Sequence, residues 1–401
     1  MNSHHADQSE QQDAAENVAP ASPASASGLT WGLCVATLNR IDVLERCVAL
    51  ALDQSRAPSE VVIVDASDDW RQHEERIAKI TDSFGTPLTY LPARLKSSAN
   101  QRNQGIAASS SDILFMIDDD SLMFPGAAKE IMSLYEADQD KQCAAIGLSS
   151  RDALPGTATT EDNTAATPPT NIGGRAVVWQ RRNKLVKFIY KELFLLTMDR
   201  LFYEYAPTPA TSPEGGAPAW MQGRGNFTNF IGGFAMTVRR DIAQREPFNR
   251  HLMSYCPAED LDTVYRWRRH GFAMFARNAG VHHLVVQTSR IQPKHVTILQ
   301  ITNMVFMTCF NTNRPVLDRI GVSVRVLRRV LADFLKDAGT LRLMFPKFRA
   351  ALMSLPQVVR LLSYGQDELP RKYERFQCEL LWGVSAPILN PDAMAGELHE
   401  N

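Results

Sequence analysis

The chain has 401 residues, of which 44% are hydrophobic and 22% are charged. These proportions are typical of globular proteins, and they exclude a collagen-like chain, a wholly disordered chain and a mini-protein. Lys and Arg number 43 and Asp and Glu number 44, so the formal net charge is −1. Such a balance creates no overall field that would attract nucleic acid, and no nucleic-acid partner is expected.

Six cysteines occur without a CxxC pair or a repeated spacing. This pattern favours reduced thiols in a cytoplasmic protein over a zinc ribbon or a disulfide framework. Residues 1–28 are polar and rich in Ala, Ser and Pro, which predicts a disordered leader without the apolar core of a signal peptide. The longest uncharged stretch, 295–313, contains Gln, Asn and four Thr, so no transmembrane helix is predicted.

Apolar runs and helical spacings alternate from Trp31 onward. Strands are predicted over 31–39, 60–65, 88–91 and 113–117, and helices over 42–52, 70–84 and 100–108. The run EVVIVD is rich in β-branched residues and stops at an acid, as strands buried on both faces of a parallel sheet do. The alternation predicts a doubly wound α/β sheet, whose ligands bind beyond the carboxyl ends of its strands.

The second half of the chain is less regular. After a helix over 127–137 and a strand over 144–148, residues 151–225 form a long predicted insertion: an Ala/Thr/Pro-rich loop, a helix over 175–205 and a second loop. A strand from 231, a helix, a helix over 263–270 and strands over 272–276 and 281–287 complete a domain predicted to span 29–310. Residues 311–401 are predicted to be a helical extension, with nine Lys/Arg against three Asp between 311 and 349.

Acidic residues follow two of the predicted strands. Asp118, Asp119 and Asp120 come directly after the apolar run ILFMI, and paired carboxylates at such a place can hold Mg²⁺ or Mn²⁺. Asp65 ends VVIV, where it could accept a hydrogen bond from a base or a ribose, or simply cap the next helix. No GxGxxG loop follows either strand, which disfavours a dinucleotide-dependent oxidoreductase.

Two later clusters add candidate groups. Glu259 and Asp260 open a predicted helix, where a carboxylate can be a general base or an ordinary N-cap. His282 and His283 lie in the strand VHHLVV, and a histidine beside an acidic metal site can supply a third ligand.

The order of these segments resembles family 2 glycosyltransferases with the GT-A fold, a Rossmann-like α/β sheet. The segments are VATLNR, VIVDASDD, QRNQG, FMIDDDS, IGGFAMTVRR, AEDLDTVYRWRRHG and VHH, and the resemblance covers about residues 33–289. It implies inverting transfer of a hexosyl or deoxyhexosyl group from a UDP- or dTDP-sugar to a saccharide or lipid-linked saccharide. The setting it implies is bacterial polysaccharide biosynthesis.

The resemblance also implies roles for individual residues. Donor-binding positions are Thr37, Asn39, Arg40, Asp65, Arg102, Asn103, Asp118 and Asp119. Among these, Asp65 would contact the pyrimidine base and Asp118, first in the DxD motif, the ribose. Asp120 and a late histidine would hold the metal ion, with His282 preferred over His283. Asp260 would be the general base with Glu259 beside it, and Gly232 and Gly233 would line the acceptor side.

Two other functions remain open at this stage. A nucleotidyltransferase acting on sugar phosphates also uses strand-end acids and Mg²⁺, but it needs a glycine-rich loop that VATLNRID lacks. A non-catalytic glycan-binding protein would not need Asp118, Asp120 and Asp260 together. The C-terminal helix with Val324, Leu327, Val330, Leu331 and Leu335 beside arginines either packs on the catalytic domain or rests on an anionic membrane at the inner face of the plasma membrane.

Overall fold

A computed structural model describes residues 28–156, 188, 204–210, 212–213, 215–286, 291–340, 342–390 and 393. The predicted leader, apart from Gly28, lies outside these residues. So does nearly all of the helix predicted over 175–205.

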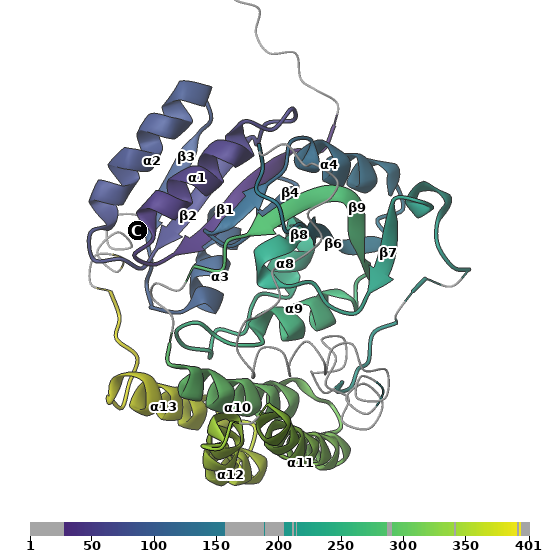
Figure 1. The fold of residues 1–401 in the computed structure, drawn as a ribbon. Coiled ribbons are helices and arrows are strands. Elements are labelled where there is room, and N and C mark those ends of the chain that lie inside the picture. The colour runs from purple at the N-terminus through teal and green to yellow at the C-terminus, as the bar shows by residue number, and fades with distance from the viewer. Residues whose placement is uncertain are drawn as a thin grey trace, which may run out of the picture.

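The described residues form a nine-stranded mixed sheet at the centre of the molecule (Figure 1). The strands are β1 (Trp31–Thr37), β2 (Glu60–Asp65), β3 (Leu88–Pro92), β4 (Ile113–Met116), β5 (Ser121–Met123), β6 (Cys143–Ser150), β7 (Gly225–Thr228), β8 (Met236–Arg239) and β9 (Phe272–His283). Their order is β3-β2-β1-β4-β8-β6-β9-β5, and β7 pairs with β9. The strands β1 to β4 run parallel, whereas β8 is antiparallel to β4 and β6.

Helices cover both faces of the sheet and make two hydrophobic cores. The helices before the C-terminal group are α1 (Ile41–Leu52), α2 (Trp70–Phe84), α3 (Ser98–Ala108), α4 (Ala127–Ala137), α8 (Arg240–Arg245) and α9 (Glu259–Trp267). Side chains of α1, α2 and α4 share one core with Leu33 and Val35 of β1, and side chains of α3, α8 and α9 share the other with Cys34. Alternate residues of one strand thus enter opposite cores, as the two-residue period of a strand requires. All six cysteines are buried as free thiols.

Four helices form a C-terminal group on the side of α9 (Figure 1). They are α10 (Pro293–Asn311), α11 (Pro315–Gly339), α12 (Pro346–Ser363) and α13 (Leu369–Trp382). Buried residues of α10 and α11, such as Phe306 and Val322, belong to the same core as α3 and α9. The helical region therefore begins at Pro293, ahead of the predicted boundary at 311. Within the described residues, no helix combines the length and apolarity needed to cross a bilayer.

The elements differ from the sequence predictions in several places. The strand predicted from residue 231 begins only at Met236, because 233–235 form a short 3-10 helix. The two strands predicted after residue 271 are one, β9, whose parallel register with β6 shifts between Leu148 and Ser149. Helix α9 begins at Glu259 rather than 263, because the acid cluster forms its first turn. The short strands β5 and β7 were not predicted, since three or four residues are too few for a periodic pattern.

Candidate functional site

A cavity of about 550 Å³ opens where the central strands end. Its sheet side includes Thr37 at the end of β1 and the three aspartates between β4 and β5. Its opposite side is formed by α9 and by residues of the C-terminal helices, among them Gln300, Arg325 and Trp382. The acids of 118–120 and those of 259–260 thus face one another across a single space.

Asp119, the middle acid of the DxD motif, is held by the β1 loop. Thr37 Oγ1 donates to its Oδ2 over 2.8 Å, and Arg40 Nη1 lies 3.0 Å from its Oδ1. Burial raises the pKa of Asp119 to about 6, although Arg40 and Thr37 act in the opposite direction. Thr37 and Arg40, which were predicted to bind the donor, therefore line the cavity and also position the Asp119 carboxylate.

Asp120 is buried and faces His283. His283 Nε2 lies 3.0 Å from Asp120 Oδ1 and 3.9 Å from Asp118 Oδ2, and the Val286 N–H donates to Asp120 Oδ2 over 2.9 Å. Burial opposes ionisation of Asp120, but His283, Val286 and Arg40 outweigh it and lower the pKa of this carboxyl group. One ligand atom from each of Asp118, Asp120 and His283 lies within 4.8 Å of the others. Two carboxylate oxygens and an imidazole nitrogen fit Mg²⁺ or Mn²⁺.

The structure brings His283, not the preferred His282, to the carboxylates. In the β5–β9 register Ser121 pairs with His283 and Leu122 with His282. Because successive side chains of a strand point to opposite faces, only one of the two histidines can face Asp120. His282 Nδ1 instead lies 2.9 Å from the carbonyl oxygen of Arg151.

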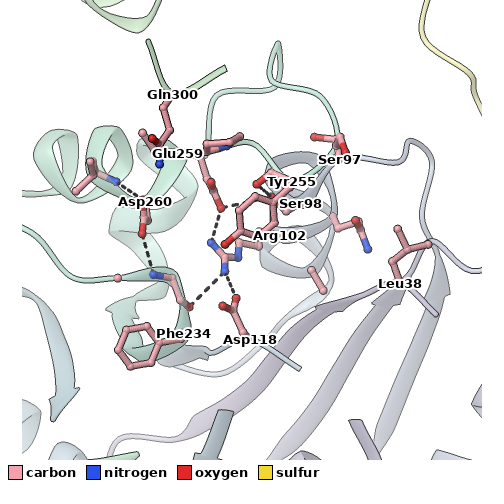
Figure 2. A pocket seen from close by; sticks show the side chains of 18 of the residues that line it. Leu38, Ser97, Ser98, Arg102, Asp118, Phe234, Tyr255, Glu259, Asp260 and Gln300 are labelled. Atoms are coloured by element: carbon pink, nitrogen blue, oxygen red, sulfur yellow. Dashed lines mark hydrogen bonds and ion pairs between the residues drawn. The ribbon is translucent and has the colours of Figure 1, made fainter. Parts of the chain in front are cut away.

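Arg102 of α3 links the two sides of the cavity (Figure 2). Its Nη2 lies 2.7 Å from Asp118 Oδ1 and donates to the Gly233 carbonyl oxygen over 3.3 Å, while its Nη1 lies 2.9 Å from Glu259 Oε1. The side chain is only 5% exposed. A Cβ on Gly233 would lie 2.8 Å from Arg102 Nη2, so the missing side chain at 233 makes room for this guanidinium group.

Asp260 differs from Glu259 in its partners. Its Oδ2 accepts from the Gly233 N–H over 3.0 Å and its Oδ1 from the Leu261 N–H over 2.9 Å (Figure 2). The described residues show no ion pair to Asp260 within 4.0 Å, whereas Glu259 is paired with Arg102. Burial raises the pKa of Asp260 above the ordinary aspartate value, although the Gly233 N–H and Arg102 act against it. An accessible carboxylate held by neutral donors can accept a proton.

The loop that leads into α9 has an unusual backbone. Ser254, Cys256 and Ala258 all have positive φ, at 61°, 45° and 73°. Asn303 Nδ2 of α10 donates to the Pro257 carbonyl oxygen over 2.7 Å, and the Tyr373 hydroxyl of α13 donates to Asn303 Oδ1. The C-terminal helices therefore support the loop that positions Glu259 and Asp260.

Three predicted donor-binding residues do not line the cavity. Asp65 is fully buried, and its oxygens accept from the Ser67 N–H at 2.8 Å and the Tyr90 hydroxyl at 2.7 Å and lie 2.7 Å from His73 Nδ1. Asn103 exchanges two 2.8 Å hydrogen bonds with the backbone of Phe248. Asn39 is exposed with a φ of 54°, a conformation that Asn tolerates better than most residues. In this structure the side chains of Asp65 and Asn103 hold neighbouring groups, and the Asn39 backbone N–H donates to Ser67 Oγ over 2.7 Å.

Other cavity residues had no signal in the sequence. Phe234 stacks on His283 with ring centroids 4.8 Å apart and planes at 3°. Gln101 donates to the carbonyl oxygens of Thr37 and Val64, which joins the ends of β1 and β2. Phe234 follows the two predicted glycines and Gln101 begins the QRN segment, so the sequence pointed to their surroundings. It could not predict which residues these two side chains contact, because those partners come from distant parts of the chain.

The family assignment comes from sequence comparison. A model described as "Glycosyltransferase like family 2" matches residues 31–300, more than half of the chain. This chain belongs to that glycosyltransferase family. No curated protein sequence matches the chain.

The chain is also similar to solved structures at low sequence identity. A mannosyltransferase from Pyrobaculum calidifontis, in complex with GDP-Man and Mn²⁺, is 14% identical, with 88% of this chain and 85% of that chain covered at a TM-score of 0.46. S. aureus TarS 1–349 with UDP-GlcNAc is 12% identical, with 88% and 91% covered at 0.43. The expected GT-A architecture with a helical C-terminal region is confirmed for this glycosyltransferase.

Proposed function

We propose that the protein is a metal-dependent inverting glycosyltransferase. It transfers a hexosyl or deoxyhexosyl group from a UDP- or dTDP-sugar to a hydroxyl group of a saccharide or lipid-linked saccharide, in polysaccharide biosynthesis. The observation that carries this proposal is Asp260: it faces the cavity, lies across Arg102 from the DxD motif and, among the described residues, has only backbone donors as partners.

The donor occupies the side of the cavity near β1 and β4. Thr37, Arg40 and Arg102 supply polar and cationic groups there. In this proposal Asp118, which also lines the cavity, contacts the ribose. Asp118, Asp120 and His283 would hold Mg²⁺ or Mn²⁺, with His283 taking the place first assigned to His282. When bound, such an ion neutralises the negative charge that develops on the leaving diphosphate.

Asp260 acts on the acceptor. A sugar hydroxyl is a weak nucleophile near neutral pH, and Asp260 removes its proton as the oxygen attacks C1 of the donor sugar. The new C1–O bond forms on the face opposite the C1–phosphate bond that breaks, so the configuration at C1 inverts. Glu259, paired with Arg102 over 2.9 Å, positions that arginine between Asp118 and Gly233.

The acceptor enters on the side of Gly232 and Gly233, where the C-terminal helices complete the wall. The proposed setting is the cytoplasm, with peripheral contact to an anionic plasma membrane through these helices. The family match favours this function over nucleotidyl transfer and over glycan binding without catalysis.

A donor panel tests the proposal. UDP- and dTDP-linked sugars are incubated with Mn²⁺ and a library of free and lipid-linked saccharides, and the product linkage is assigned by NMR. The proposal expects nucleoside diphosphate release and an inverted anomeric carbon. Pyrophosphate release would indicate nucleotidyl transfer, and retained configuration would contradict the single displacement.

A further inference from the structure

Helix α11 exposes an apolar face along its whole length. Val316, Leu317, Ile320, Val324, Leu327, Leu331, Phe334 and Leu335 are between 37% and 70% exposed. Their spacing of three and four residues places them on one side of the helix. Over about 1.5 Å per residue, this side extends for about 28 Å.

The remaining sides of α11 are occupied. Val322 and Val326 are buried in the core shared with α10, and Arg325 and Arg329 line the catalytic cavity. The side of α11 that packs on the catalytic domain is therefore not the side that carries the exposed apolar residues. Of the five apolar residues noted in the sequence, Val330 packs against that core and the other four are exposed.

The turn after α11 continues the exposed apolar face. Leu343 and Met344 are 81% and 73% exposed. Phe334 joins this turn to the helix, because its ring contacts those of Phe345 and Phe348 at centroid distances of 5.4 and 5.1 Å. We refer to the eight exposed α11 residues together with Leu343 and Met344 as the α11 surface.

Between residues 315 and 349 the exposed charges have one sign, since Arg328, Arg342 and Arg349 are exposed. The three acids of this segment are buried and partnered: Asp318 accepts from the Ala206 N–H and lies 3.1 Å from Arg314 Nη2, Asp333 accepts from Arg329, and Asp337 from the Lys347 and Phe348 N–H groups. Two copies of this surface would bring arginines together, whereas an anionic partner would neutralise them.

We infer that the α11 surface docks on an anionic lipid bilayer, with its apolar side chains in the headgroup and acyl boundary and its arginines at the lipid phosphates. A helix with an apolar face bordered by cations binds such membranes parallel to their plane. Because Arg325 and Arg329 line the cavity from other sides of the same helix, docking places the catalytic cavity about one helix diameter, roughly 10 Å, from the lipid surface. This location, which rests on the proposed function, favours a lipid-linked saccharide as the acceptor.

Vesicle flotation with the full-length protein tests the docking. Vesicles of phosphatidylcholine, with and without phosphatidylglycerol, are compared at low salt. The protein is expected to float with the anionic vesicles only, and the double variant Leu327→Gln/Leu331→Gln to partition at least about tenfold more weakly. Phe84→Gln is the matched control, since Phe84 is a 48% exposed apolar residue on α2, and it should float as the parent does.

Charge is tested separately with Arg328→Gln, which is expected to weaken partitioning about fivefold at low salt. Failure of the parent to float, or unchanged flotation of the double variant, would overturn the inference. If the parent instead self-associates in sedimentation experiments and the double variant does not, the α11 surface is an interface between copies.

Binding of UDP with Mn²⁺ separates this inference from the proposed function. Every variant of the α11 surface is expected to bind UDP as the parent does, because none of the substituted residues lines the cavity. A parent that floats but binds no nucleotide would contradict the proposed function and leave the docking intact.

Discussion

The backbone of Gly233 connects Asp260 to Arg102: its N–H donates to Asp260 Oδ2 over 3.0 Å and its carbonyl oxygen accepts from Arg102 Nη2 over 3.3 Å. Arg102 in turn pairs with Asp118 and Glu259. The proposed base and the first acid of the DxD motif are thus fixed relative to one another through a single residue of the backbone.

Asp260→Asn is expected to lower turnover by roughly 10²–10⁴-fold while donor and metal binding are kept. The amide keeps the shape of the side chain but cannot take a proton. Steady-state kinetics and calorimetry with UDP and Mn²⁺ measure the two effects. If Asp260→Asn is nearly as active as the parent while Glu259→Gln is inactive, the base is Glu259; if both are active, base catalysis by this pair is wrong.

The pH profile follows from the raised pKa of Asp260. Since the base must be ionised, kcat/KM falls as the pH is lowered through this pKa, and the Asn variant lacks that limb. Because the folded state favours the protonated carboxyl, its ionisation destabilises the fold progressively as the pH rises above about 4. Thermal unfolding should therefore show the parent losing stability relative to the Asn variant as the pH rises above about 4, with a constant difference between the two proteins at lower pH. A parent that gains stability relative to the variant as the pH rises would contradict this sign.

The two neighbouring histidines provide a matched test of the metal site. His283→Ala is expected to weaken Mn²⁺-dependent nucleotide binding by at least about tenfold, because it removes a nitrogen 3.0 Å from Asp120. His282→Ala should leave it unchanged, since that ring contacts the Arg151 carbonyl. Asp120→Ala should abolish the metal dependence. Equal effects at 282 and 283 would argue against His283 as a ligand.

Asp65→Ala tests whether this acid contacts the base or supports the fold. The structure predicts a loss of about 3 kcal/mol in the free energy of unfolding, because Ser67, His73 and Tyr90 all lose a buried carboxylate partner. Tyr90→Phe removes only one of these bonds and should cost about 1 kcal/mol. Urea unfolding measures both. Unchanged stability with clearly weaker UDP binding would favour the base contact implied by the family resemblance.

Gly233→Ala is expected to lower kcat by at least about tenfold. The added methyl would lie 2.8 Å from Arg102 Nη2, and Arg102 cannot move without leaving Asp118 or Glu259. Gly365→Ala is the control, since no heavy atom of the described residues lies within 4 Å of the added methyl group and Gly365 does not line the cavity. The measurement is kcat, and thermal unfolding checks that both variants are as stable as the parent. Equal kcat values for the two variants would show that Arg102 moves to accommodate the methyl group without loss of activity.

The sequence predicted the edge of the sheet at which the cavity lies, because the carboxyl ends of parallel strands meet at one side of a sheet. The polar residues after β1 and the acids after β2 and β4 are therefore expected to lie near one another. The sequence could not choose between His282 and His283, because that choice depends on the register of β9 against β5. The sequence also did not show that Asp65 lies outside the cavity, because the partners that bury this side chain, His73 and Tyr90, belong to other elements. The cavity wall at Gln300 and Trp382 depends on how separate helices pack, for which a single sequence has no local pattern.

The positive φ angles of Ser254, Cys256 and Ala258 have a consequence for protein engineering. Each costs about 1 kcal/mol or more, and the loop keeps this geometry because α10 and α13 hold it through Asn303 and Tyr373. A fragment that stops at residue 310 would contain every proposed catalytic group and still lose Tyr373. We expect its loop to relax and Asp260 to drift from Gly233, so a minimal active fragment of this glycosyltransferase must extend through α13.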